Sequence, residues 1–189
     1  MTTCGRRVIR VNDKISAMPH HPITYTIRPA TPADEPILWD MLFYAANMAE
    51  DGATSSAAAK AHPYLAEFVA GWGQSSDLGV IAISCAAGHA LGAAWLRQLR
   101  GPEKHYAAVA EGVPELAIAV VPAMIGQGIG GALLGALLDL ARGRYPAVAL
   151  SVREHNPARH LYERHGFVVV DTITNRIGGQ SFVMLVDLR

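Results

Sequence analysis

Cysteine and net charge are both scarce in this sequence. Its 189 residues contain only Cys4 and Cys85, and 16 basic residues balance 16 acidic ones. Two cysteines in unlike settings do not form a disulfide framework, so we expect reduced thiols in a cytoplasmic protein. Zero net charge excludes a global basic field, and we expect no nucleic-acid partner. The histidines His155, His160 and His165 recur every five residues and share no helix face, so we expect no metal site.

The length of the chain predicts a single domain with a sizeable core, preceded by a tail. We place the domain at residues 23–189 and an N-terminal extension at residues 1–22. Arg6 and Arg7 are followed by no apolar stretch, so the extension is not a secretory signal. We expect it to be a flexible arm, and self-association as a homodimer is an interpretation that the sequence leaves open.

The segment Leu116–Leu138 carries no charge and is long enough to cross a bilayer. However, Pro122, Gln127 and five glycines interrupt it. A change from strand to helix inside a soluble core explains this composition better than a membrane span. We therefore expect no membrane partner.

The chain is organised around a buried strand, a glycine-rich loop and a helix. Glu115–Val121 reads as a strand that stops at Pro122, because proline supplies no N–H to a ladder. Helical spacing follows, with Ile129, Leu133, Leu137 and Leu140 expected on one apolar face. Glycine tolerates positive φ and allows close approach of a ligand, and the free N–H groups of a helix N-terminus favour phosphate. The stretch therefore predicts a diphosphate site at its glycines, Gly126, Gly128, Gly130 and Gly131.

A dinucleotide fold is a rival interpretation of the same glycines. Gly126, Gly128 and Gly131 satisfy G-x-G-x-x-G, and Glu154 is a candidate ribose-binding acid. In that fold the motif follows its strand almost at once and opens a series of βαβ units. Here four residues separate Val121 from Gly126 and most of the chain lies upstream, which disfavours NAD binding.

The remaining segments alternate between strand and helix patterns around this centre. Thr31, Pro32 and the acids Asp34 and Glu35 are typical of a helix start. The helix that follows is rich in large side chains, some of which are candidates for the wall of an acceptor pocket, as are two histidines: Trp39, Phe43, Tyr44, Met48, His62 and His105. Helical pieces are expected at 55–60, 64–72 and 156–165, and strands at 24–28, 78–85, 90–99, 147–152, 166–171 and 181–188. This order predicts a mixed α/β sheet rather than a doubly wound one.

Three motifs in this order resemble the GCN5-related N-acetyltransferase (GNAT) superfamily over roughly residues 24–188. They are Val120-Val121-Pro122 at a strand end, the loop Ile125–Gly130, and Asn156–Phe167, which contains Leu161-Tyr162-Glu163. The resemblance implies a mixed central sheet flanked by helices, in which two parallel strands splay apart to hold acetyl-CoA. One departure is Ile125, which stands where the family usually has Gln or Arg. We expect the backbone N–H groups to maintain binding, with Arg159 or Arg153 as candidates to compensate.

The resemblance also implies roles for individual residues. Tyr162 matches the general acid that protonates the thiolate of coenzyme A, and Glu115 matches a general base on the central strand. Peptide groups of Ala119 and Val120 would bind the pantetheine arm and polarise the acetyl carbonyl, with Asn156 on the other side. The expected cofactor-binding residues are Ile118, Ala119, Val120, Gly126, Gln127, Gly128, Ile129, Gly130, Gly131, Asn156 and Arg159.

The function implied is direct acetyl transfer from acetyl-CoA to a primary amine, without a metal. No Cys or Ser stands in a motif suited to an acyl-enzyme. A small-molecule amine is the first expectation for the acceptor, and a protein N-terminus or lysine the second. The alternative is a GNAT-fold sensor that binds acetyl-CoA without turnover.

Overall fold

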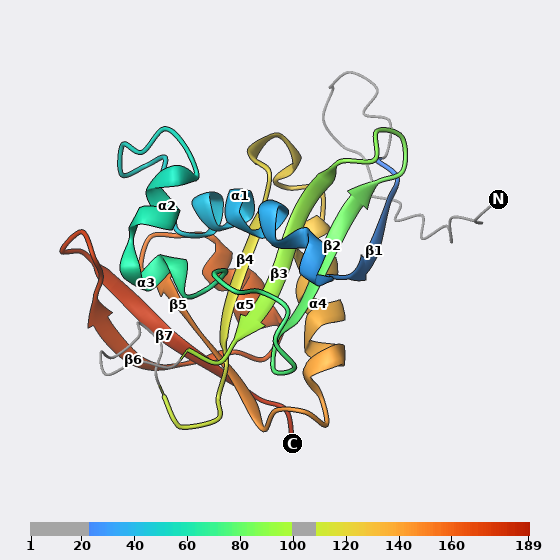
Figure 1. Ribbon diagram of the computed structural model, residues 1–189. Helices are drawn as coiled ribbons and strands as arrows, with labels where there is room; N and C mark the ends of the chain where they lie inside the picture. Colours follow the sequence, from blue (N-terminus) through green and yellow to red (C-terminus); the bar gives the residue numbers. More distant parts are fainter. Residues whose placement is uncertain (1–22, 100–108) are drawn as a thin grey trace, which may run out of the picture.

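The computed structural model describes residues 23–99 and 109–189 (Figure 1). The extension 1–22 and His105 lie outside these residues. The strands are β1 Tyr25–Pro29, β2 Leu78–Ser84, β3 Ala90–Arg97, β4 Glu115–Val120, β5 Ala147–Arg153, β6 Val168–Thr174 and β7 Gln180–Asp187. The helices are α1 Glu35–Ala45, α2 Ala57–Ala61, α3 Pro63–Ala66, α4 Ile129–Ala141 and α5 Ala158–Arg164, with 3-10 turns η1 Pro32–Asp34 and η2 Pro122–Met124.

The seven strands form one sheet in the order β1-β2-β3-β4-β5-β7-β6. Every neighbouring pair is antiparallel except β4 and β5, which run parallel. A doubly wound dinucleotide fold would need a mostly parallel sheet. The expected mixed α/β sheet is therefore confirmed.

Helices cover both faces of the sheet, which gives a three-layer arrangement. In Figure 1, α1, α2 and α3 lie in front of the sheet, while α4 and α5 lie behind it. Two separate groups of buried side chains fill the two interfaces. The loop between β4 and α4 thus leads from the end of the sheet to the rear layer.

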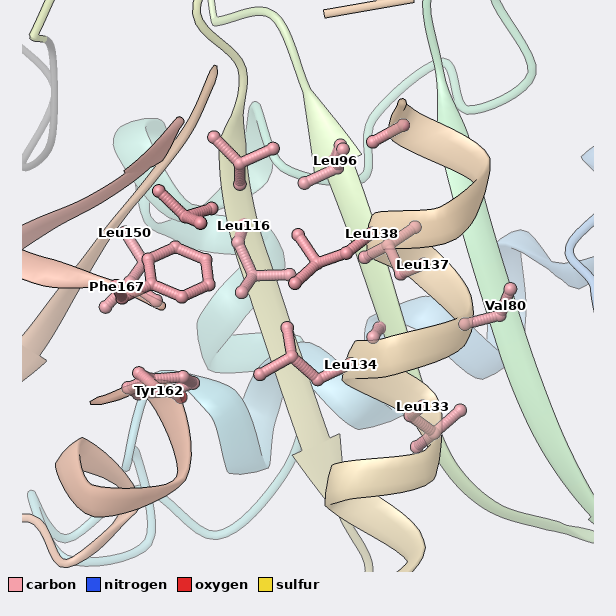
Figure 2. Packing of buried hydrophobic residues seen from close by; sticks show 14 of the residues in the cluster. Val80, Leu96, Leu116, Leu133, Leu134, Leu137, Leu138, Leu150, Tyr162 and Phe167 are labelled. Atoms are coloured by element: carbon pink, nitrogen blue, oxygen red, sulfur yellow. The ribbon is translucent and has the colours of Figure 1, made fainter. Parts of the chain in front are cut away.

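The rear core is built on the apolar face of α4. Figure 2 shows the leucines of α4 reaching toward Val80, Leu96 and Leu116 on three strands. Leu140 was expected on this face but is 40% exposed. The buried spacing continues instead through Leu138 and Ala141, because a helix period of 3.6 residues carries position 140 round to the solvent side.

The front core packs α1 against β3 and β4 around Trp95, which is fully buried. The indole N–H of Trp95 donates to the carbonyl of Phe68 at 2.9 Å, so its polar atom is satisfied inside the core. Trp39 and Met48 are also buried here and act as core residues. The segment after Ala66 forms turns, so the helix expected over 64–72 is reduced to α3.

The strand at the centre ends at Val120, one residue before the predicted end, and Pro122 opens η2. The uncharged stretch is thus divided between a six-residue strand and a thirteen-residue helix. Among the described residues, no helix is both long and apolar enough to cross a membrane.

Candidate active site

Strands β4 and β5 separate almost immediately after they meet. Their described pairing consists of Glu115 opposite Ala149, where the Ala149 N–H donates to the carbonyl of Pro114 at 3.0 Å. On their outer sides, β4 pairs with β3 over six residues and β5 with β7 over seven. The rest of the β4–β5 boundary is therefore a split held open by complete ladders on either side.

Backbone alternation determines which peptide groups face this split. The Val121 N–H donates to the carbonyl of Leu91, so odd-numbered residues of β4 bond to β3 and even-numbered residues point the other way. Ile118 and Val120 thus direct their N–H and C=O groups into the split. Ala119 faces Ala93 in a hydrogen-bonded pair, and its peptide groups are used within the sheet.

A cavity of about 120 Å³ occupies the split. Its floor is formed by both strands, its roof by the end of α1 and by the α3 region, and its side by α5 and the β6–β7 turn. The roof is apolar apart from Asn47, whereas the side carries amide, hydroxyl and guanidinium groups. The lining residues are Leu42, Ala45, Ala46, Asn47, Leu65, Phe68, Leu116, Ala117, Ile118, Leu150, Ser151, Val152, Arg153, Asn156, Tyr162, Asn175, Arg176 and Ser181.

Tyr162 projects from α5 into the cavity and is 8% exposed. Its ring packs edge-on against Phe167, with ring centroids 5.9 Å apart, and Figure 2 shows Phe167 between Tyr162 and Leu150. Burial raises the pKa of the Tyr162 hydroxyl to about 12. The phenol therefore stays protonated at neutral pH and is available as a proton donor.

The glycine loop has the geometry of an anion site. Gly126 and Gly128 have φ of 84° and 76°, and no heavy atom beyond their chain neighbours lies within 4 Å of where a Cβ would stand. Ala132 N–H makes the first backbone bond of α4, to Gly128. The N–H groups of Ile129, Gly130 and Gly131 precede it and have no acceptor inside the helix.

The four glycines of the loop do not share one role. Gly126 and Gly128 are required by their left-handed backbone conformation. A Cβ on Gly130 would stand 3.4 Å from Leu161, and one on Gly131 would stand 3.6 Å from the same side chain, which are ordinary contact distances, so these two positions face α5 without requiring glycine for space. Ile129 is 1% exposed and offers only its N–H. Gln127 is exposed beside Ile125, whose side chain is 69% exposed.

Asn156 and Arg159 occupy the two sides of the start of α5. The Asn156 Oδ1 accepts a hydrogen bond from the Ala158 N–H at 2.9 Å, while its side chain lines the cavity. Arg159 does not line the cavity. Its Nε donates to Glu163 at 2.7 Å and its guanidinium stacks 4.7 Å from the ring centre of Phe182, so the structure does not bring Arg159 to the cavity.

Glu115 is buried, 4% exposed, at the closed end of the split. It lies directly opposite Arg97 on β3, and both side chains share the front face of the sheet with Ala117. The neighbouring Ala117 lines the cavity but Glu115 does not. Tyr162 and Glu115 therefore stand at different depths, with the carboxylate beyond the cavity floor.

Sequence reasoning missed Arg176 and named Arg153 only as a candidate to compensate for Ile125, whereas the structure places Arg153 on the cavity lining, paired with Glu50 and Asp51. Arg153 on β5 and Arg176 in the β6–β7 turn both bind Asp51, which follows α1. Burial alone would raise the pKa of Asp51, but the hydrogen bonds and charges of Arg153 and Arg176 outweigh it and lower the pKa. The cluster ties three segments together over the cavity. Arg176 lies in a turn-rich stretch, where sequence patterns carry no information about such a long-range contact.

The aromatic residues of α1 do not line the cavity between the strands. Phe43 and Tyr44 border a second, wider hollow of about 550 Å³ on the front layer, together with Asp40, His89 and Val121. His62 borders neither hollow. No group of three or more His, Cys, Asp and Glu side chains in the described ranges is placed to hold a metal ion.

Solved structures share this fold at low sequence identity. An acetyltransferase of the GNAT family from Streptococcus pneumoniae superposes with a TM-score of 0.62 and 18% identity, covering 88% of this chain and 100% of its own. A spermidine N-acetyltransferase SpeG chimera from Vibrio cholerae and hSSAT gives 0.59 and 18%, covering 87% and 95%. AAC(6')-Ib in complex with ribostamycin and coenzyme A gives 0.56 and 21%, covering 87% and 93%.

Two sequence comparisons concern the family of this chain. A search of curated proteins gave no match. The family model described as "Acetyltransferase (GNAT) family" matches residues 42–167, a range that includes β4, the glycine loop, α4, β5 and α5. Since this range is well over half of the chain, the protein belongs to the GNAT family of acetyltransferases.

Proposed function

We propose that this protein is an acetyl-CoA-dependent N-acetyltransferase that acts directly on a primary amine. The observation that carries the proposal is that three features lie around the split between β4 and β5. Strand peptide groups without a strand partner face the split, a protonated phenol lines its cavity, and a glycine loop with free helix N–H groups stands at the open end of β4.

Coenzyme A fits the residues around the split. The N–H groups at the start of α4 would bind the diphosphate, because the loop is open on its outer side and the helix end is electropositive. Ile118 and Val120 would pair with the pantetheine arm through their inward-facing peptide groups, in preference to Ala119. The free amide nitrogen of Asn156 would complete this contact from the α5 side, since its oxygen already serves the helix.

Proton transfers must balance the reaction. When bound, acetyl-CoA supplies a thioester whose carbonyl carbon bonds to the acceptor nitrogen while its C–S bond breaks and the electron pair leaves on sulfur. Tyr162 would give its proton toward the leaving sulfur, and its raised pKa matches a group that donates only as charge develops. The strand N–H groups would stabilise the negative charge on the carbonyl oxygen.

The second proton, lost by the amine, needs an acceptor outside the cavity lining. No carboxylate or imidazole is among the described residues that line the cavity. Glu115 lies two residues from Ala117 on the same strand face, so we assign it this role through an intervening water. Glu115→Gln should lower kcat/KM most at low pH, where the ammonium form of the amine dominates. An equal loss at all pH values would assign Glu115 to structure alone.

Small-molecule amines are the proposed acceptors, with protein N-termini and lysines second. Two of the structural neighbours are an acetyltransferase of spermidine and a protein in complex with an aminoglycoside and coenzyme A. Another neighbour is a dodecameric spermidine acetyltransferase, and self-association of this chain, as a homodimer or larger, is part of the proposal.

The competing hypothesis is a sensor that binds acetyl-CoA without turnover. Release of free coenzyme A thiol, measured against a panel of primary amines, separates the two. We expect amine-dependent thiol release by the wild type, and a loss of about 10²–10⁴-fold in kcat for Tyr162→Phe with unchanged acetyl-CoA affinity. Binding of acetyl-CoA with no thiol release for any amine would favour the sensor.

A further inference from the structure

The charged side chains that line the split are both arginines. Arg153 and Arg176 contribute to the cavity wall, and the described lining contains no Asp or Glu. A cationic acceptor would therefore meet like charge where a polyamine site needs carboxylates. The zero net charge of the whole chain does not reveal this excess of positive side chains on the cavity lining.

Asp51 balances only part of this positive charge. Both of its oxygens accept from Arg153, at 2.8 and 2.7 Å, and Arg176 binds it as well. The second partner of Arg153 is Glu50, at 3.2 Å, but the Glu50 side chain is 69% exposed. A contact to such an exposed carboxylate contributes little to stability, so a ligand carboxylate can replace Glu50 at small cost.

Arg176 has unused donors at the same place. Its Nη2 donates to the carbonyl of Ala46 and meets Asp51. No hydrogen bond donated by its Nη1 or Nε appears in the described part of the chain. An arginine side chain presents five N–H donors in a planar fork that matches a carboxylate. Arg176 is 16% exposed and Arg153 19%, so a bound anion would be partly shielded from water.

The part of the lining that comes from α1 and the α3 region is mostly apolar. Leu42, Leu65 and Phe68 belong to it. A ligand that spans the cavity would thus meet hydrocarbon on one side and guanidinium groups on another, with Tyr162 on the same lining.

We propose that the acceptor is a primary amine that also carries a carboxylate and an apolar group, as in an aliphatic α-amino acid, with Arg176 and Arg153 binding the carboxylate. This inference deepens the proposed function and rests on it. It separates the chain from the structural neighbour that acetylates spermidine, although the folds agree.

The wild-type protein tests this with three related amines: leucine, leucinamide, and 3-methylbutylamine, which is leucine without its carboxyl group. Initial rates of thiol release at saturating acetyl-CoA give kcat/KM for each, with spermidine as a cationic comparison. We expect leucine to exceed the other three by about 10- to 100-fold, the effect of one charge-assisted contact. Equal rates for leucine and leucinamide, or preference for spermidine, would overturn the assignment.

Variants of the two arginines test whether these residues cause the preference for leucine over leucinamide. Arg176→Gln should reduce the ratio of leucine to leucinamide toward one by raising KM for leucine, and Arg176→Lys should restore part of it. Arg153→Gln should act in the same direction. The matched control is Arg142→Gln, an exposed arginine paired with Asp139 at the end of α4, which should leave the ratio unchanged. A ratio that survives in both cavity variants would contradict the proposed contact.

A binding measurement keeps the inference separable from the activity. Calorimetric titration of N-acetylleucine and N-acetylleucinamide into the protein saturated with coenzyme A requires no turnover. Preferential binding of the carboxylate form supports the site even if no amine is acetylated, in which case only the catalytic proposal fails. Equal binding, or no binding of either compound, overturns the carboxylate site while acetyl transfer to other amines can still be observed.

Discussion

Glu115 and Ala149 form the one described residue pair between β4 and β5. Every residue beyond this pair lies in a gap that the outer ladders keep open. An opening in the middle of a sheet is costly, since peptide groups there lose their strand partners. The molecule retains it where the glycine loop and Tyr162 are also found, which is why we regard the gap as the centre of function.

Gly92 should be intolerant of any side chain. A Cβ there would stand 2.6 Å from the carbonyl oxygen of Ala119 and 3.2 Å from the Cα of Val120, and a β-strand backbone cannot withdraw without breaking its ladder. We expect Gly92→Ala to lower the free energy of unfolding by about 1–3 kcal/mol, measured by urea denaturation.

Gly135→Ala is the opposite case in the same core layer. Gly135 lies inside α4, and the nearest atom to its absent Cβ is the Nε2 of His165 at 3.9 Å. Alanine should raise the free energy of unfolding by about 0.4–1 kcal/mol because it restricts the unfolded chain. A destabilisation at position 135 equal to that at position 92 would contradict the packing described between α4 and α5.

Gly128 should be required for acetyl-CoA affinity as well as for backbone conformation. Gly128 and Gly143 share a φ of 76° and open surroundings, so alanine costs each about 1–2 kcal/mol of strain. Only Gly128 precedes the helix N-terminus assigned to the diphosphate. Calorimetric titration should therefore show weaker acetyl-CoA binding for Gly128→Ala and unchanged binding for Gly143→Ala, and equal losses in both would refute a local role for the loop.

Asp34 should make stability depend on pH in the acid range. Hydrogen bonds from Arg28 chiefly, with Thr31, hold the pKa of Asp34 well below its usual range, against the effect of burial. A lowered folded-state pKa gives stability that is complete above the unfolded value of about 3.9 and is lost as pH falls toward the folded value. Asp34→Asn should thus cost about 1–2 kcal/mol at pH 7, and less at pH 3.

The control for this prediction is Asp187→Asn. Asp187 pairs with Arg189, two residues along the chain, and both side chains are largely exposed, so solvent screens the pair. Unfolding midpoints of this variant should match the wild type at both pH values. A gap between Asp34→Asn and wild type that widens at pH 3 would reverse the sign that we assign.

Ionisation of Tyr162 should not lower kcat at alkaline pH below the pKa of this residue, because burial raises that pKa to about 12. The proton that Tyr162 donates is still present at pH 9 or 10, where an exposed tyrosine would begin to ionise. We expect kcat to remain flat up to pH 10 in a thiol-release assay with saturating substrates. A decline centred near pH 10 that Tyr162→Phe abolishes would place the phenol in water instead of in the cavity.

The strand-loop-helix centre was predictable because its signals are local. Pro122 ends the strand because proline has no backbone N–H, and Gly126 and Gly128 indicate backbone positions with positive φ. The parallel strands at the cleft and the mixed sheet were likewise confirmed. The cavity side was not predictable, because Arg176 reaches Ala46 across 130 residues. The depth of Glu115 depends on Arg97 and Ala149, its neighbours on two other strands, and periodicity does not reveal such pairings.

Calorimetric titration with acetyl-CoA, with NAD as the control ligand, tests the central assignment most directly. The open split and the glycine loop predict one acetyl-CoA per chain with micromolar affinity, and no heat of binding for NAD. Absence of acetyl-CoA binding would contradict the account, because Ile125 would then mark a loop that no longer binds the cofactor. The proposed acetyl transfer would then also be wrong.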